Sequence, residues 1–308
     1  MAKHKSRLFR ATDYLHPRYW SMWITFALLR LTVLLPYPYI LKIGRLLGRL
    51  IQRLSGKRQR IVDINLQLCF PDKSAAERSL IKDKSYQNLG ISLLEMAMCW
   101  WWKPEQLKPL VEIRGLEHIQ ASLDNKKGVI LLSGHFTSLE IGGRLLALFT
   151  PFQVMYRTQK NVLFDSYLFT KRDSYFVQTI SRKNTRKLIK GLRSGVPTWY
   201  APDQDFANER NTFAPFFGVP TATITASARL AESGNAVMLP FYPERKADGS
   251  GYILWIKPPL ENFPSSDELA DTTAINASIE QFVVQNPDQY MWVHKRFKTR
   301  PTGEPRIY

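Results

Sequence analysis

Residues 128–140 read GVILLSGHFTSLE, and this stretch decides the fold. Its first five residues form an uninterrupted apolar run, which is typical of a strand buried on both faces of a sheet. The polar residues Thr137 and Ser138 then predict the start of a helix that extends to residue 149. Working outward, we expect further buried strands at 196–200, 236–241 and 252–256, and helices at 61–102, 184–194 and 222–233. Strands that alternate with helices predict an α/β sheet with helices on its faces.

A histidine and an acid occupy the place where the first strand meets its helix. Catalytic groups in open α/β sheets gather at the carboxyl ends of strands. On one continuous helix, His135 and Glu140 would point about 140° apart, so they cooperate only if His135 lies on the turn before the helix. Gly134 favours such a turn. We therefore expect His135 and Glu140 to form a catalytic pair, with a satisfied core histidine as the alternative for His135.

Charge and aromatic content indicate the kind of partner. Lys and Arg outnumber Asp and Glu by 43 to 26, and the resulting net charge of +17 predicts an anionic partner. Nucleic acid, an anionic membrane, a phosphorylated substrate and an acidic protein all fit this charge. The chain also holds 8 Trp, 13 Tyr and 17 Phe. Because aromatic rings settle at membrane interfaces while basic side chains meet lipid phosphates, these features favour a membrane surface over nucleic acid.

The amino-terminal region predicts how the chain meets that membrane. Residues 19–35 are almost continuously apolar, and a stretch of this length is about the minimum for a membrane span. They follow a basic segment that includes Lys3, Lys5 and Arg7. Residues 40–54 predict a helix with leucines on one face and four cations on the opposing face, Lys42, Arg45, Arg49 and Arg53. Such a helix is typical of one that lies in the plane of an anionic membrane.

These patterns divide the chain into two regions. We expect residues 1–59 to form a single anchor and a basic amphipathic helix, and residues 60–308 to form one catalytic domain. Positive charge flanks the apolar segment on both sides, but the heavier cluster follows it, which predicts that the catalytic domain lies in the cytoplasm.

Several blocks of sequence carry a resemblance to known families. The His-x4-acid motif and three later blocks, at 154–157 (VMYR), 201–220 and 237–243 (VMLPFYP), resemble the glycerolipid-type acyltransferases in the expected order. More narrowly, the whole chain resembles the lipid A late acyltransferases. The shared stretches lie at 15–20 (LHPRYW), 65–71 (NLQLCFP), 199–205 (WYAPDQD) and 289–301 (QYMWVHKRFKTRP), and the last looks like the lauroyl-transferring branch. The family motif is usually written with Asp, for which Glu140 stands in here.

This resemblance implies a mixed sheet flanked by helices and an enzyme of the bacterial inner membrane. It implies transfer of a fatty acyl chain from acyl carrier protein to the hydroxyl of a 3-hydroxyacyl group on a lipid A precursor of the lipid IVA type. His135 would act as general base and Glu140 would orient it, and no cofactor or metal is implied. Anionic phospholipids are the expected membrane partner. The substrate-binding residues we predict are Arg157, Arg182, Asp203, Asp205, Arg210, Lys295 and Arg296.

Two alternatives from other functional classes stay open. Asp203 and Asp205 read as Asp-x-Asp, which holds a metal-bound diphosphate in many glycosyltransferases. A non-enzymatic protein that binds a membrane surface or nucleic acid would explain the charge alone. A serine hydrolase is disfavoured because the chain has no Gly-x-Ser-x-Gly motif, and nucleotide use is disfavoured because it has no Gly-rich phosphate loop.

Overall fold

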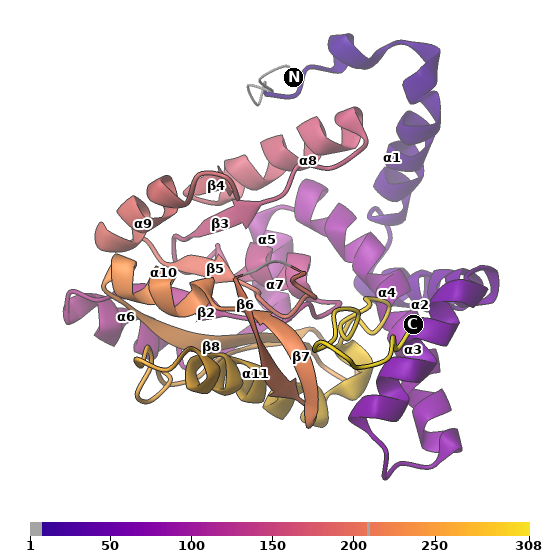
Figure 1. Cartoon of the computed structure of the whole chain (residues 1–308). Helices are drawn as coiled ribbons and strands as arrows, with labels where there is room; N and C mark the ends of the chain where they lie inside the picture. The colour runs from indigo at the N-terminus through magenta and orange to yellow at the C-terminus, as the bar shows by residue number, and fades with distance from the viewer. Residues whose placement is uncertain (1–7, 208–209) are drawn as a thin grey trace.

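A seven-stranded sheet forms the centre of the computed structural model, which describes residues 8–207 and 210–308 (Figure 1). The strand order is β1-β9-β8-β2-β5-β3-β4. The strands are β1 Val111–Arg114, β2 Gly128–Leu132, β3 Gln153–Tyr156, β4 Gln178–Ser181, β5 Thr198–Tyr200, β8 Ala236–Arg245 and β9 Tyr252–Ile256. Neighbouring strands run parallel except β8 and β9, which are antiparallel. The expected mixed α/β sheet and its four predicted strands are confirmed.

Helices cover both faces of this sheet, and β2 shows why. Val129 and Leu131 point into one apolar cluster, whereas Ile130 and Leu132 point into the other. One cluster packs beneath α4 Ala75–Trp101, α6 Leu116–Asp124, α7 Leu139–Leu146 and α8 Val162–Tyr175. The other packs beneath α3 Gly56–Cys69, α9 Thr185–Arg193, α10 Ala226–Gly234 and α11 Glu268–Gln285. A strand buried on both faces must be apolar throughout, as the sequence of β2 is.

One predicted helix begins later than expected. Residues 222–224 belong to β7 Val219–Ile224, which pairs antiparallel with β6 Asn211–Phe216 in a separate two-stranded sheet. The helix that follows, α10, starts at Ala226. The prediction that residues 222–233 are helical is therefore wrong at its start, because Thr221 and Thr223 lie in the strand with their side chains buried.

The amino-terminal helices pack against the rest of the chain. The helix α1 covers Trp20–Thr32, and α2 covers Tyr37–Leu54. Residues buried in these helices, Phe26, Ile40 and Leu41, share one cluster with the sheet. Among the described residues, we find no helix with the length and apolar character that a membrane crossing requires. The predicted spanning anchor is therefore unsupported, since α1 has 13 residues and extends about 20 Å. Lys3, Lys5 and Arg7 lie outside the described residues.

The helix α2 packs on the protein through one face of small residues. Its buried face carries small residues, because the helix packs closely on α4: a Cβ on Gly48 would lie 2.1 Å from the carbonyl oxygen of Tyr86. Leu46, Leu50 and Leu54 instead point to solvent, and they are 60%, 51% and 78% exposed. The predicted helix is confirmed, and its leucines form an exposed apolar row beside the cations while the small residues pack on α4.

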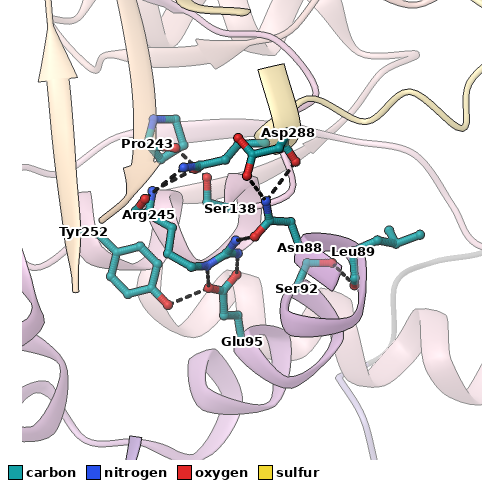
Figure 2. A network of polar contacts seen from close by, with 10 residues as sticks. Asn88, Leu89, Ser92, Glu95, Ser138, Pro243, Arg245, Tyr252 and Asp288 are labelled. Atoms are coloured by element: carbon teal, nitrogen blue, oxygen red, sulfur yellow. Dashed lines mark hydrogen bonds and ion pairs between the residues drawn. The ribbon is translucent and has the colours of Figure 1, made fainter. Parts of the chain in front are cut away.

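A buried polar network ties α4 to the sheet and to the short helix η4 Pro287–Gln289 (Figure 2). The Arg245 guanidinium, at the end of β8, donates two hydrogen bonds of 2.7 Å to the Glu95 carboxylate on α4. Arg245 also donates to the Asn88 side chain at 2.7 Å, and Asn88 donates to Asp288 of η4 at 3.0 Å. The Tyr252 hydroxyl completes the network by donating to Glu95 at 2.6 Å. These contacts fix the position of η4, which leads into the candidate site.

Candidate active site

Two neighbouring strands deliver a histidine and an aspartate to the same edge of the sheet. The parallel strands β2 and β5 pair Leu132 with Tyr200, the last residue of each. His135 lies three residues beyond β2, and Asp203 lies three residues beyond β5. The carboxyl ends of adjacent parallel strands meet at one edge, so the two loops lie side by side. His135 occupies the turn before α7, as expected.

The His135 ring contacts the Asp203 carboxylate directly. The His135 Nδ1 atom lies 2.5 Å from Asp203 Oδ1. The backbone N–H of His135 donates to Asp203 Oδ2 at 2.7 Å, and the buried Tyr290 hydroxyl donates to the same oxygen at 2.8 Å. Three donors therefore converge on one carboxylate that is only 2% exposed.

These contacts set the protonation of both groups. Burial alone would raise the pKa of Asp203, but His135 and the hydrogen bonds hold it well below its usual range. Burial alone would lower the pKa of His135, but the Asp203 carboxylate raises it above its usual value. The ionised carboxylate can only accept, so Nδ1 carries a proton and neutral His135 has its lone pair at Nε2. The ring is thus in the tautomer that a general base needs.

The segment 287–292 closes over this pair. The backbone N–H of Thr137 donates to the carbonyl of Gln289 at 2.8 Å, and that of Met291 donates to the carbonyl of His135 at 3.0 Å. A bridge between Phe136 and Tyr290 lies between these two bonds. On the other side, a Cβ on Gly134 would lie 3.3 Å from Asp203 Oδ2. The loop carrying His135 is therefore held from both sides.

Glu140 does not contact His135 through a hydrogen bond in the described structure. Its carboxylate accepts from Arg172 of α8, through Nε at 3.1 Å and through Nη2, and from the Tyr175 hydroxyl at 3.2 Å. The geometry of the predicted pair is therefore wrong. Glu140 is the second residue of α7 and faces α8, whereas His135 faces the loop after β5. Asp203 holds the position beside the imidazole that we expected for Glu140.

A cavity of about 300 Å³ opens at His135. Its apolar lining includes Leu139, Val154, Met155, Phe176 and Trp199. Three arginines also line it: Arg157 and Arg182, both predicted as substrate-binding residues, and Arg172, which the sequence reasoning missed. The structure therefore brings a base, three guanidinium groups and an apolar wall to one cavity, which suits a ligand with an anionic group and a hydrocarbon part.

The other five predicted substrate-binding residues are not part of this lining, and one of them, Asp203, contacts His135 instead. Asp205 accepts hydrogen bonds from the backbone N–H and the hydroxyl of Thr299, at 2.8 and 3.1 Å. Arg210 is exposed just before β6, and its carbonyl accepts the N–H of Thr225. Lys295 is exposed over the Tyr308 ring.

Arg296 is the clearest correction within this group. It is only 3% exposed and donates to the carbonyl of Ala222 at 2.9 Å and to the Thr223 hydroxyl at 3.0 Å. These contacts anchor the carboxyl-terminal segment to β7, so the predicted surface cation is a buried structural residue.

The contacts of Asp203 and Asp205 also bear on the alternative of a metal-bound diphosphate. The two carboxylates contact different parts of the chain: Asp203 binds His135 and Tyr290, and Asp205 binds Thr299. The Asp-x-Asp pattern is thus explained by hydrogen bonds that hold this loop against its neighbours, rather than by a diphosphate site.

Comparison with known proteins identifies the family to which the chain is similar. A model of the family described as bacterial lipid A biosynthesis acyltransferase matches residues 9–299. The chain is similar to three proteins of Escherichia coli (strain K12). Identity is 40% to a lipid A biosynthesis lauroyltransferase, over 97% of this chain and 98% of that one. It is 37% to a lipid A biosynthesis palmitoleoyltransferase, over 96% and 97%, and 32% to a lipid A biosynthesis myristoyltransferase, over 96% and 92%.

Proposed function

The chain belongs to the bacterial lipid A biosynthesis acyltransferase family, and from that premise we propose that it transfers a lauroyl chain from acyl carrier protein to a lipid A precursor. The acceptor is the hydroxyl of a 3-hydroxyacyl group on a precursor of the lipid IVA type. The higher identity to a lauroyltransferase than to a myristoyltransferase supports the choice of chain. The cavity at His135, with apolar walls and three arginines, is the observation that carries the proposal.

His135 acts as the general base in this reaction. The acceptor hydroxyl oxygen attacks the thioester carbonyl carbon while Nε2 of His135 takes the hydroxyl proton. The carbon–sulfur bond then breaks, and the imidazolium returns the proton to the leaving thiolate. The nearby Asp203 carboxylate stabilises the imidazolium that forms and holds the ring orientation. The reaction therefore needs no reactant other than the thioester and the acceptor hydroxyl.

Glu140 contributes through Arg172 in this proposal. Its carboxylate accepts two hydrogen bonds from one edge of the Arg172 guanidinium, and Arg172 lines the cavity beside His135. We assign Arg172, Arg157 and Arg182 to the phosphates of the lipid acceptor and to the carbonyl oxygen of the thioester. Glu140 is therefore a positioning residue, whereas Asp203 contacts the base itself.

The enzyme acts at the cytoplasmic face of the bacterial inner membrane, where the exposed apolar side chains of α1 and α2 insert into one leaflet. Ile24, Leu28 and Leu31 of α1 are 61%, 59% and 60% exposed, and the exposed leucines of α2 add to this apolar surface. Burying one such side chain in lipid contributes about 1–2 kcal/mol. The cations of α2 lie beside the leucines, where they meet anionic phospholipid headgroups. In this proposal, residues 1–59 serve membrane contact and residues 60–308 carry the chemistry.

The test is a product-resolved transfer assay. Purified protein is incubated with a tetraacylated lipid A precursor and, in parallel, with lauroyl, myristoyl and palmitoleoyl thioesters of acyl carrier protein. Mass spectrometry then weighs the lipid products. We expect one added lauroyl group per acceptor, formed fastest from the lauroyl donor. Preference for another chain would overturn the lauroyl assignment, and the absence of any acylated product would overturn the proposed transfer.

A further inference from the structure

The helix α9 carries a cationic face that the proposed chemistry does not use. Five cations lie on or just before this helix, and all of them are exposed: Lys183, Arg186, Lys187, Lys190 and Arg193. At 100° per residue, the four cations within the helix fall on one side of it, while Leu188 and Leu192 face the core. We call these five residues the α9 surface.

The stretch of sequence that carries the α9 surface contains no acidic residue. The sequence has no Asp or Glu between Asp173 and Asp203. Within residues 8–207 and 210–308, none of the five cations takes part in an ion pair. An uncompensated cluster of this size repels itself, and an anionic partner relieves that repulsion.

The position of the α9 surface connects it to the active site. It starts directly after Arg182, which lines the cavity at His135. The strand before it, β4, is the last in the sheet order, so α9 lies at one edge of the molecule. In Figure 1, α9 lies at the left end of the molecule, whereas α1 and α2 lie at the right. A partner that contacts the start of α9 therefore sits near the cavity and clear of the apolar surface of α1 and α2, whereas the end of α9 lies toward the first residue of β2.

The chemistry of the surface favours an acidic protein over a lipid bilayer. No large apolar side chain is exposed between residues 178 and 195, although α1 and α2 expose many. A surface that enters a membrane combines apolar and basic residues, whereas a purely cationic one is typical of a docking face for an acidic protein.

We propose that the α9 surface docks the acidic acyl carrier protein that delivers the acyl thioester to the cavity. This inference rests on the proposed function, which names that donor. Docking there places the carrier at the cavity mouth, so that its thioester reaches His135 while the lipid acceptor approaches from the membrane side.

The experiment compares two lauroyl donors, the acyl carrier protein thioester and the uncharged pantetheine thioester. The variant is Arg186→Glu with Lys190→Glu, and the control is Lys84→Glu with Lys108→Glu, two exposed cations elsewhere with the same change in charge. We expect KM for the carrier donor to rise about tenfold to a hundredfold in the α9 variant, with transfer from the pantetheine donor unchanged. The control should match the wild type, and the wild-type KM should rise with salt.

A binding measurement separates failure of the inference from failure of the proposed function. Fluorescence anisotropy of labelled acyl carrier protein, titrated with wild type and variant at low salt, needs no turnover. Weaker binding to the variant supports the inference even if no transfer is seen. Equal binding to both proteins, an unchanged KM for the carrier donor, or an equal loss with both donors would overturn it, the last pointing instead to contact with the lipid acceptor.

Discussion

Replacing Asp203 by Asn should abolish most of the activity by reversing the tautomer of His135. Asp203 Oδ2 accepts from two fixed donors, the His135 backbone N–H and the Tyr290 hydroxyl, at 2.7 and 2.8 Å. An asparagine keeps its single oxygen at these donors, so its NH₂ group faces His135 Nδ1. Because an NH₂ group only donates, Nδ1 must give up its proton and Nε2 must hold it. The base then has no lone pair for the acceptor hydroxyl.

The magnitude follows from the hydrogen bonds that must break in this variant. Restoring the productive tautomer requires the amide to flip, which leaves the His135 backbone N–H and the Tyr290 hydroxyl without an acceptor, at a cost of about 1–3 kcal/mol for each buried donor and about 2–6 kcal/mol in all. This corresponds to a fall in kcat of about 10–10⁴-fold. His135→Ala should fall in the same range, because it removes the base itself. Glu140→Gln changes charge by the same amount but should cost roughly tenfold, since it weakens one charge-assisted contact to Arg172.

The assay is single-turnover transfer measured by mass spectrometry, with thermal denaturation to establish that each variant is folded. The pH profile gives a second readout. Asp203 raises the pKa of His135, and only neutral His135 is a base, so the wild-type rate falls as pH drops through that raised pKa. In Asp203→Asn the pKa of His135 falls, so the decrease of the remaining activity on acidification should occur at a lower pH than in the wild type. Near-normal turnover by Asp203→Asn, together with a loss of thousands-fold in Glu140→Gln, would refute this reasoning and restore Glu140 as the partner of His135.

Three further perturbations follow from the structure. Tyr290→Phe removes one donor from the carboxylate beside the base and should lower kcat about tenfold without changing KM for the acceptor; an unchanged pH profile and rate would mean that Tyr290 only packs there. Glu95→Ala leaves Arg245 buried without its partner and should lower the free energy of unfolding in urea by about 3–5 kcal/mol, whereas a loss below about 1 kcal/mol would show that water replaces the carboxylate. Leu46→Ser with Leu50→Ser should release protein from anionic vesicles in a sedimentation assay while thermal stability is kept, and undiminished sedimentation would place the membrane contact elsewhere.

The sheet was largely predictable because its central strands are short apolar runs. Residues 128–132 are buried on both faces, so their sequence carries no polar positions, and the position of His135 at the end of that strand follows directly. The hairpin of β6 and β7 was missed because its strands carry Thr and Pro among apolar residues and resemble the start of the next helix.

The partner of His135 was not predictable from spacing along the chain. Glu140 is five residues away and was the natural choice, whereas Asp203 is 68 residues away. One feature of the sequence does point to Asp203 as the partner, because His135 and Asp203 each lie three residues beyond a predicted strand. Using it requires knowing that β2 and β5 are neighbours, and the order of strands in a sheet depends on tertiary packing that a single sequence does not reveal.

Which side chains are buried was also not predictable from the sequence alone. Arg296 lies in a run of basic residues that predicts a solvated or ligand-binding surface, but its guanidinium is buried against β7. On α2, the spacing of Leu46 and Leu50 predicts an apolar face but not the second, buried face of Gly44 and Gly48, which depends on the close packing of α2 on α4. In both cases, the sequence identifies the side chains and only packing decides which of them are buried.

The closure of the active site by residues 287–292 has a consequence for the synthesis of the enzyme. The ribosome produces this segment after every strand of the sheet, so a nascent chain can pair β2 with β5 and bring His135 near Asp203 before Tyr290 exists. Until Tyr290 and the backbone of Gln289 are made, the loop that carries His135 lacks the contacts that these residues supply. We therefore expect full activity only after residues 287–292 are synthesised, and a polypeptide interrupted before residue 287 would lack these contacts.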